Sequence, residues 1–339
     1  MTYFSVLGDS ISTFEGLIPE GWRLYYDKYF REDTGVIEPS DTWWGRVIDH
    51  FGGKLLVDGA FSGSLVEGAG FPAGDSDERV AALAKDGVSP DVVLVYIGIN
   101  DYGWGGARAQ AAGRGNARPA CVAGAAEPAP AVAGVASADA LSRFAAAYES
   151  MLVRVRAAYP QARVWCVTHC AGHSRGCEHA TFTDNLRGVP LASYNAAIRE
   201  AARNAGANVA DAAAFGLDYQ CREDGVHPTV FGMAQLARMV ELSIEHEREI
   251  AAEHEAFGVM RGAPGPVTAA LAAQVVAETG AYVSDPCTKG RACVGCSEAV
   301  FTGNEWICAC RRGGESLPAW DALALAGRLA DEKLLEEGR

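Results

Sequence analysis

The stretch Tyr3-Phe4-Ser5-Val6-Leu7-Gly8-Asp9-Ser10-Ile11 decides how the rest of the chain is interpreted. Its apolar first half predicts a buried strand, which Gly8 ends abruptly. A serine just past a strand, beside a glycine, can present its hydroxyl at the carboxyl edge of a sheet, and open α/β folds place their ligand sites at that edge. Because most serines are turn or cap residues, Ser10 gains weight only from partners far downstream.

Beyond this stretch the pattern alternates between helix and strand. Apolar runs bounded by glycine or proline predict strands over 54–57, 91–97, 163–168 and 207–211. Amphipathic segments predict helices over 43–51, over 76–85, from about 137 to Pro160, over 193–204 and after Pro228. Strands that alternate with helices predict an α/β fold with a parallel, doubly wound sheet.

Two connections are unusually long. The one after Ser10 holds five aromatic residues between positions 22 and 30, and it fits a pocket wall as well as a satellite hydrophobic cluster. Residues 103–136 are rich in alanine and glycine without periodicity, which predicts an exposed insertion that leaves the Asn100 loop. Shielding of the site and a tolerated surface insertion are both open interpretations of this segment.

Residues that suit acyl transfer follow the expected strands. Such a reaction needs an activated hydroxyl, a base, a group that orients the base, and donors for the oxyanion. Ser10 supplies the hydroxyl, and His227 can take its proton because imidazole titrates near neutrality. Asp224, three residues earlier, is close enough in a turn to hold the imidazole tautomer. The side-chain amide of Asn100 and the backbone N–H groups of Gly63 and Ser10 make three oxyanion donors.

Together these residues resemble the four sequence blocks of the SGNH, or GDSL-type, hydrolase family. Gly8-Asp9-Ser10 matches the serine block, and Gly63, in Phe61-Ser62-Gly63-Ser64, matches the glycine block. Gly98-Ile99-Asn100-Asp101 matches the Gly-x-Asn-Asp block, and Asp224-Gly225-Val226-His227 matches the Asp-x-x-His block. The blocks occur in the order of the family, and the resemblance covers roughly residues 3–245.

The resemblance implies a flavodoxin-like three-layer α/β/α sandwich with a parallel sheet. It also implies a hydrolase that cleaves small acyl esters through an acyl-serine, with Ser10, Asp224 and His227 as catalytic residues and no metal or cofactor in catalysis. O-acetyl groups on carbohydrate fit the family, while lipid, thioester and amide substrates stay open. Asp9 and Asp101, beside the site, are interpreted as structural.

A second serine motif competes with the first. Gly172-His173-Ser174-Arg175-Gly176 fits the Gly-x-Ser-x-Gly elbow of α/β-hydrolases and follows an expected strand. Against it, the four residues 169–172 separate the strand from the turn, and the sequence after Ser174 does not predict the helix that an elbow requires. The same loop could bind a metal or line a pocket. Its candidate ligands are His169, Cys170, His173, Cys177 and His179.

The C-terminal part of the chain is rich in cysteine. Cys293-x-x-Cys296 and Cys308-x-Cys310 are separated by eleven residues, with Gly303-Asn304 at the turn of an expected hairpin. Four thiolates in this pattern predict a structural Zn²⁺ site, which would fold a segment too short for a core of its own. An iron–sulfur cluster that also uses Cys287 is one alternative, and free or disulfide-paired cysteines are the other.

These patterns divide the chain into four parts. A hydrolase domain is expected over 1–258, a linker and helix over 259–286, the Cys-rich segment over 287–312 and a C-terminal amphipathic helix over 313–339. A different class of function is an interaction protein whose Cys-rich tail binds a partner. The complete set of catalytic residue types favours the enzyme.

Composition restricts the partners and the compartment. The 339 residues carry a formal charge of −14, which argues against nucleic acid or anionic membrane as a partner. The expected partner, a small-molecule ester, is what the family resemblance implies. No run of about 18 apolar residues predicts a membrane span, and Met1 is followed at once by the first strand, so we expect a cytoplasmic protein. Ten cysteines in such a protein favour thiols or metal ligands over disulfides. The sequence does not indicate an oligomeric state.

Overall fold

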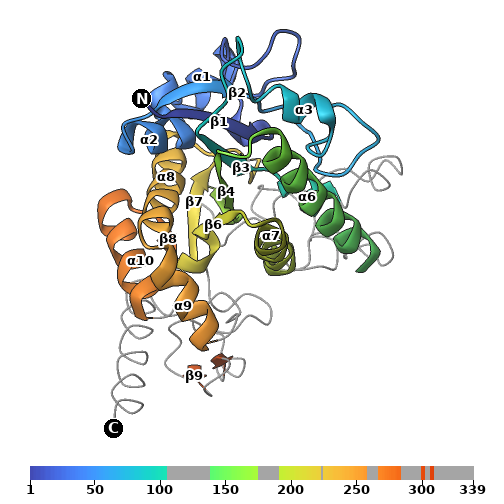
Figure 1. Cartoon of the computed structure of the whole chain (residues 1–339). Helices are drawn as coiled ribbons and strands as arrows, with labels where there is room; N and C mark the ends of the chain where they lie inside the picture. The colour runs from blue at the N-terminus through green and yellow to red at the C-terminus, as the bar shows by residue number, and fades with distance from the viewer. Residues whose placement is uncertain are drawn as a thin grey trace.

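A five-stranded parallel sheet forms the centre of the described chain (Figure 1). The computed structural model describes residues 1–104, 138–174, 191–222, 224–257, 266–283, 299–301 and 306–308. The strands, in spatial order, are β2 (Lys54–Asp58), β1 (Tyr3–Gly8), β3 (Val92–Tyr96), β4 (Arg163–Val167) and β6 (Asn208–Ala210). This is the strand order of flavodoxin-like sheets, with the switch point between β1 and β3. The predicted α/β class and parallel sheet are confirmed.

The middle strands owe their place to their apolar sequence. β3 reads Val-Val-Leu-Val-Tyr, and all five residues are buried, as expected for a parallel strand that is covered on both faces. β1 pairs with β2 on one side and with β3 on the other, where Gly8 lies opposite Tyr96. The two neighbouring strands therefore deliver the residues that follow them, Ser10 and Asn100, to the same edge of the sheet.

Helices cover both faces of the sheet (Figure 1). On one face α2 (Trp43–His50) packs against α8 (Val230–Glu245). On the other face α6 (Ala138–Ala158) packs against α7 (Leu191–Ala205), and α3 (Asp77–Ala81) contacts α6. These are the helices that the sequence predicts. α3 is shorter than expected because the chain turns back on itself soon after it, in a bridge between residues 85 and 88.

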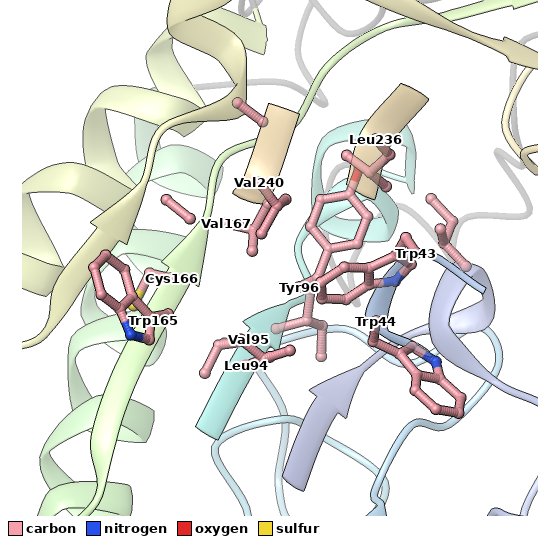
Figure 2. Close-up of a cluster of buried hydrophobic side chains, with 14 of the residues drawn as sticks. Trp43, Trp44, Leu94, Val95, Tyr96, Trp165, Cys166, Val167, Leu236 and Val240 are labelled. Carbon is pink, nitrogen blue, oxygen red and sulfur yellow. The ribbon is translucent and has the colours of Figure 1, made fainter. Parts of the chain in front are cut away.

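The core between β3 and α2 is rich in aromatic side chains (Figure 2). Trp43 and Trp44 are buried, and the ring of Trp43 lies 5.3 Å from the ring of Tyr96 between centroids. The two indoles also donate hydrogen bonds to Ser12, to its Oγ at 3.1 Å and to its carbonyl oxygen at 2.8 Å. Because Ser12 belongs to the turn that begins at Ser10, the core holds this turn in place.

The strand that precedes the Asp-x-x-His block belongs to a second, smaller sheet. It has the order β5-β7-β8, made of β5 (Gly172–Ser174), β7 (Leu217–Cys221) and β8 (Tyr282–Val283). β7 is parallel to β5 and antiparallel to β8. No strand is predicted over β7 from the sequence, although its residues Leu-Asp-Tyr-Gln-Cys alternate between apolar and polar as in a strand. β7 leads directly toward Asp224 and His227.

The core continues past the domain boundary that the sequence predicts. After α9 (Glu247–Phe257) comes α10 (Pro266–Thr279), which packs against α8. Ala272 and Val275 of α10 are fully buried in the same core as the main sheet. The described part of the segment predicted as a linker and helix over 259–286 thus shares the core of the main sheet, because α8 covers its apolar helix.

The predictions for the tail fall mostly outside the described residues. Cys293, Cys296, Cys310, the helix over 313–339 and nearly all of the 103–136 insertion lie there. Cys308 ends β10 (Trp306–Cys308), which pairs antiparallel with β9 (Ala299–Phe301) as the expected hairpin requires. The other described elements are η1 (Ser10–Ser12), α1 (Lys28–Thr34), η2 (Pro39–Asp41), α4 (Ile99–Trp104) and η3 (Ala212–Phe215).

The described ranges contain neither a metal-binding cluster nor a membrane-spanning helix. No group of three or more His, Cys, Asp or Glu side chains within these ranges could hold a metal ion, so the structure gives the predicted zinc site no support. Among the same residues, no helix has the length and apolar character needed to cross a membrane.

Candidate active site

Ser10 lies where the sequence places it, at the carboxyl end of a central strand. β1 ends at Gly8, and the chain then forms the single 3-10 turn η1. Asp9 caps this turn by accepting a hydrogen bond from the backbone N–H of Ile11 at 3.1 Å. Ser10 itself is 5% exposed, so its hydroxyl is presented from a rigid turn that is largely shielded from water.

His227 connects the distant Asp-x-x-His block to this serine. Its Nε2 lies 2.9 Å from Ser10 Oγ, and its Nδ1 lies 2.9 Å from Asp224 Oδ2. An ionised carboxylate can only accept, so Nδ1–H donates to Asp224 and Nε2 is left to accept the hydroxyl proton. Two residues that are 217 positions apart in the chain thus share a hydrogen bond, in the arrangement that activates a serine nucleophile.

The Asp224 carboxylate is held in its ionised form by many donors. Its Oδ1 accepts the backbone N–H groups of Val226 and His227 at 2.9 and 3.0 Å. Its Oδ2 also accepts from the Tyr25 hydroxyl at 2.8 Å and from Arg222 Nη1 at 3.3 Å. Burial acts to raise the pKa of Asp224, but the hydrogen bonds and charge of its neighbours, His227 first, hold that pKa well below the ordinary value.

Tyr25 and Arg222 are parts of the site that the motif analysis missed. The Tyr25 ring stacks on the His227 imidazole, with ring centroids 3.4 Å apart and an angle of 7° between the planes. Arg222 Nη1 donates to the Tyr25 hydroxyl at 2.8 Å, and the same guanidinium forms ion pairs with Asp224 and Asp33. Burial and the charge of Asp224 raise the pKa of Tyr25, so its hydroxyl stays a donor. The sequence signal for Tyr25 is the long aromatic connection, for which a pocket wall was one of two open interpretations.

The loop of residues 61–64 carries Gly63 between the serine turn and Asn100. The N–H of its first residue donates to the Gly8 carbonyl at 3.0 Å, and its last carbonyl accepts from Asn100 Nδ2 at 3.0 Å. Gly63 has a φ of +78°, a left-handed conformation that favours glycine. Within the described chain, the backbone N–H groups of Ser10 and Gly63 have no hydrogen-bond acceptor, so both are available to a substrate oxygen.

Asn100 enters the site from the first turn of α4. One of its amide hydrogens is used on the loop of residues 61–64, which leaves the second for a substrate. The next residue, Asp101, is buried, and its carboxylate accepts the Val66 N–H at 2.9 Å. Burial raises the pKa of Asp101 to about 8. Asp101 thus ties neighbouring loops together, which agrees with the structural role that the sequence analysis assigns to it.

A buried charged cluster of Asp9, Asp58 and Arg79 lies beneath the serine turn. The guanidinium of Arg79 donates to the carbonyls of Gly8 at 2.7 Å and of Pro72 at 2.8 Å. Burial raises the pKa of Asp9 to about 7 and that of Asp58 to about 8, and it lowers the pKa of Arg79 to about 10. The cluster supports the backbone on which Ser10 is mounted.

The rival motif lies in a different structural setting. Ser174 is the last residue of β5, whose backbone pairs with β7, so the Gly-x-Ser stretch is a strand and not the sharp turn of a nucleophile elbow. His169 is buried, and burial lowers its pKa to about 4. His173 stacks on the ring of Tyr282 at 4.0 Å between centroids. Cys177 and His179 fall outside the described residues.

The sequence of this chain also matches the model of a known protein family. The model of a family described as GDSL-like lipase/acylhydrolase matches residues 2–174, just over half of the chain. The chain belongs to the GDSL-like lipase/acylhydrolase family. The protein is therefore an ester-hydrolysing enzyme. Ser10, Gly63 and Asn100 lie in the matched part of this GDSL-like hydrolase, whereas Asp224 and His227 lie beyond it.

Solved structures align with this GDSL-like hydrolase at low sequence identity. A Bacteroides uniformis protein assigned as a GDSL-like lipase is 23% identical, with 73% of this chain and 95% of that chain covered and a TM-score of 0.46. A Bacteroides ovatus protein with the same assignment is 20% identical, with coverages of 72% and 98% and a TM-score of 0.47. A family two carbohydrate esterase from Clostridium thermocellum, solved in complex with cellohexaose, is 14% identical, with coverages of 74% and 65% and a TM-score of 0.40. Comparison with curated proteins gave no significant match.

Proposed function

We propose that the protein is a serine esterase in which Ser10 is the nucleophile, His227 the general base and acid, and Asp224 the carboxylate that orients the base. The observation that carries this proposal is the pair of contacts at 2.9 Å on the two nitrogens of His227. The low pKa of Asp224 supports it, because an ionised carboxylate selects the required tautomer and stabilises the imidazolium that forms during the reaction.

The first half-reaction transfers the acyl group to the enzyme. Ser10 Oγ attacks the carbonyl carbon of the ester while its proton moves to His227 Nε2. The carbonyl oxygen becomes an oxyanion, for which the proposed donors are the N–H groups of Ser10 and Gly63 and the free amide hydrogen of Asn100. His227 then gives its proton to the alcohol oxygen as the ester bond breaks, and the acyl group remains on Ser10.

The second half-reaction releases the acid. A water molecule loses a proton to His227 as its oxygen attacks the acyl carbon, and the same donors hold the second oxyanion. When the bond to Ser10 Oγ breaks, His227 returns the proton to that oxygen. The enzyme is restored, and one ester and one water have become one acid and one alcohol.

The test compares the two candidate serines on a short-chain chromogenic acetate. We expect Ser10→Ala to lower kcat by at least about 1000-fold, since Ser10 Oγ lies 2.9 Å from His227 Nε2, and Ser174→Ala to resemble the wild type, since Ser174 ends a strand and not a nucleophile elbow. Mass spectrometry after treatment with a fluorophosphonate should find the label on Ser10 even if the acetate is a poor substrate. A label on Ser174, or activity lost only in Ser174→Ala, would replace the nucleophile proposed here.

We further propose small acyl esters of carbohydrate, O-acetyl groups foremost, as the substrate class. An aromatic cluster of Trp22, Phe61 and Phe71 adjoins the Gly63 loop, with Trp22 and Phe71 centroids 5.2 Å apart and Phe71 43% exposed. Such faces suit the apolar side of a sugar ring. An acetylated sugar should be hydrolysed faster than 4-nitrophenyl palmitate, and the opposite preference would point to a lipid substrate.

A further inference from the structure

Residues 22–25 run along the site from the glycine loop to the histidine. The carbonyl of Arg23 accepts the N–H of Ser62 at 2.8 Å, and the N–H of Tyr25 donates to Thr13 Oγ1 at 2.9 Å. The Thr13 hydroxyl in turn donates to the carbonyl of Ser10 at 3.0 Å. The backbone of the segment is therefore held at fixed positions relative to both the nucleophile and the glycine loop.

Arg23, in this segment, lies beside the glycine that is proposed as an oxyanion donor. A methyl group on Gly63 would lie 3.5 Å from Arg23 Nη1 and 4.0 Å from its Cζ. The side chain of Arg23 is exposed, while that of Trp22 is partly buried against Phe61 and Phe71. A positive charge with an aromatic surface at its side thus adjoins the proposed reaction centre.

Arg23 differs from the other arginines around the site. Arg222 and Arg31 are ion-paired with acidic side chains, and the buried Arg79 donates to two backbone carbonyls. Within the described chain, the guanidinium of Arg23 has no ion pair and no hydrogen bond. In a protein with a formal charge of −14, an unpaired guanidinium at this position is free to bind an anionic group that a substrate brings.

We propose that Arg23 binds an anionic group, a carboxylate or a phosphate, on the ester substrate and so makes the enzyme selective for acidic esters. The planar guanidinium presents paired N–H donors that match the oxygens of such groups. The inference rests on the proposed function, since Gly63 marks the reaction centre only if Ser10 is the nucleophile. It adds the charge of the substrate, which the family assignment leaves open.

The kinetic test uses three matched chromogenic esters at low ionic strength. 4-Nitrophenyl acetate is neutral, mono-4-nitrophenyl succinate carries a carboxylate on the acyl side, and 4-acetoxy-3-nitrobenzoate carries one on the alcohol side. We expect Arg23→Gln to lower the ratio of kcat/KM for one anionic ester to that for the acetate by about tenfold, and Arg23→Lys to lower it less. Arg163→Gln is the matched control, because Arg163 is exposed at the start of β4, at the opposite edge of the sheet.

The ester whose ratio falls shows on which side of the scissile bond the anionic group lies. The preference should also weaken at high salt, because the arginine is exposed. A ratio that Arg23→Gln leaves unchanged for both anionic esters overturns the proposal, whether or not all three rates fall together, since a purely structural role of Arg23 would lower them equally.

Binding to the inactive Ser10→Ala variant separates this inference from the proposed function. By calorimetric titration, Ser10→Ala should bind one anionic ester about tenfold more tightly than 4-nitrophenyl acetate, and the double variant with Arg23→Gln should lose that difference. If the wild type hydrolyses none of the esters but this difference is found, the proposed function fails and the Arg23 site stands. If the esters are hydrolysed but no Arg23-dependent preference is found, the proposed function stands and the Arg23 site fails.

Discussion

Two sets of carboxylates flank Ser10, and they differ in charge. Asp224, on the side of His227, is partly exposed and has a pKa well below the ordinary value. Asp9 and Asp58, beneath the serine turn, are fully buried and have pKa values of about 7 and about 8. All three are aspartates of one site, and burial by itself would raise the pKa of each.

The difference comes from the number and charge of the hydrogen-bond donors. Asp224 accepts from two backbone N–H groups and from the side chains of His227, Tyr25 and Arg222. Asp9 and Asp58 share the single positive charge of the buried Arg79. The donor-rich carboxylate therefore serves the histidine as a charge, while the donor-poor pair has raised pKa values, is partly protonated near neutral pH and supports the backbone.

Asp224→Asn removes the ionised carboxylate beside His227 and has the largest expected effect. We expect kcat on a chromogenic acetate to fall by about 10³- to 10⁴-fold, because an amide neither stabilises the imidazolium nor selects the required tautomer. Asp49→Asn is the matched control, since it removes an exposed carboxylate of α2. A rate within tenfold of the wild type would remove Asp224 from the mechanism.

Arg79→Met removes the positive charge from the buried cluster beneath the serine turn. It removes the donors to the Gly8 and Pro72 carbonyls and leaves Asp9 and Asp58 without a positive partner. We expect the free energy of unfolding to fall by about 3–5 kcal/mol in denaturant titrations, the usual cost of breaking a buried charged network. A loss no larger than that of the exposed Arg163→Met would show that the cluster contributes little to stability.

Tyr25→Phe tests how much one donor contributes, because it removes a hydrogen bond to Asp224 and keeps the ring stacked on His227. We expect kcat/KM to fall by about three- to tenfold, since the Asp224 carboxylate loses one of several hydrogen bonds. Tyr29→Phe removes a hydroxyl from a side chain that is 70% exposed and serves as the control. Equal rates for the two variants would show that the hydrogen bond from the Tyr25 hydroxyl to Asp224 does not contribute to catalysis.

Asp58→Asn tests the raised pKa of a buried carboxylate through the dependence of stability on pH. An aspartate in an unfolded chain ionises near pH 4, whereas Asp58 in the fold ionises at about 8, so between these values the folded state holds the extra proton. Stability should therefore decrease as the pH rises from about 5 to 8, by up to about 1 kcal/mol per pH unit for this group. An asparagine side chain cannot ionise, so the unfolding free energy of Asp58→Asn should vary less with pH. Parallel curves for the variant and the wild type would mean that Asp58 is charged in the fold.

Features that depend on the composition of one short segment were predicted correctly from the sequence. The run before Gly8 and the run of β3 are expected to be buried because they are almost entirely apolar, which places Ser10 and Asn100 at one edge of the sheet. Prediction from sequence missed β7, although the alternation of apolar and polar residues in Leu-Asp-Tyr-Gln-Cys fits a strand. It predicted a helix within 259–286 but placed it beyond a domain boundary, because the stretch before α10 is rich in glycine and proline, whereas α10 packs against α8. Local composition does not reveal what another segment will cover.

By itself the sequence determined the central strands and the reacting groups, since apolar runs seek burial and only certain side chains can act as nucleophile and base. The tertiary structure alone decided that Tyr25 covers His227, that Arg23 adjoins Gly63 and which aspartates are charged. Tyr25 and Asp224, for example, form a hydrogen bond across 199 positions of the chain. The charge of a carboxylate depends on the donors and the solvent that reach it, and in this protein those come from segments far apart in the sequence.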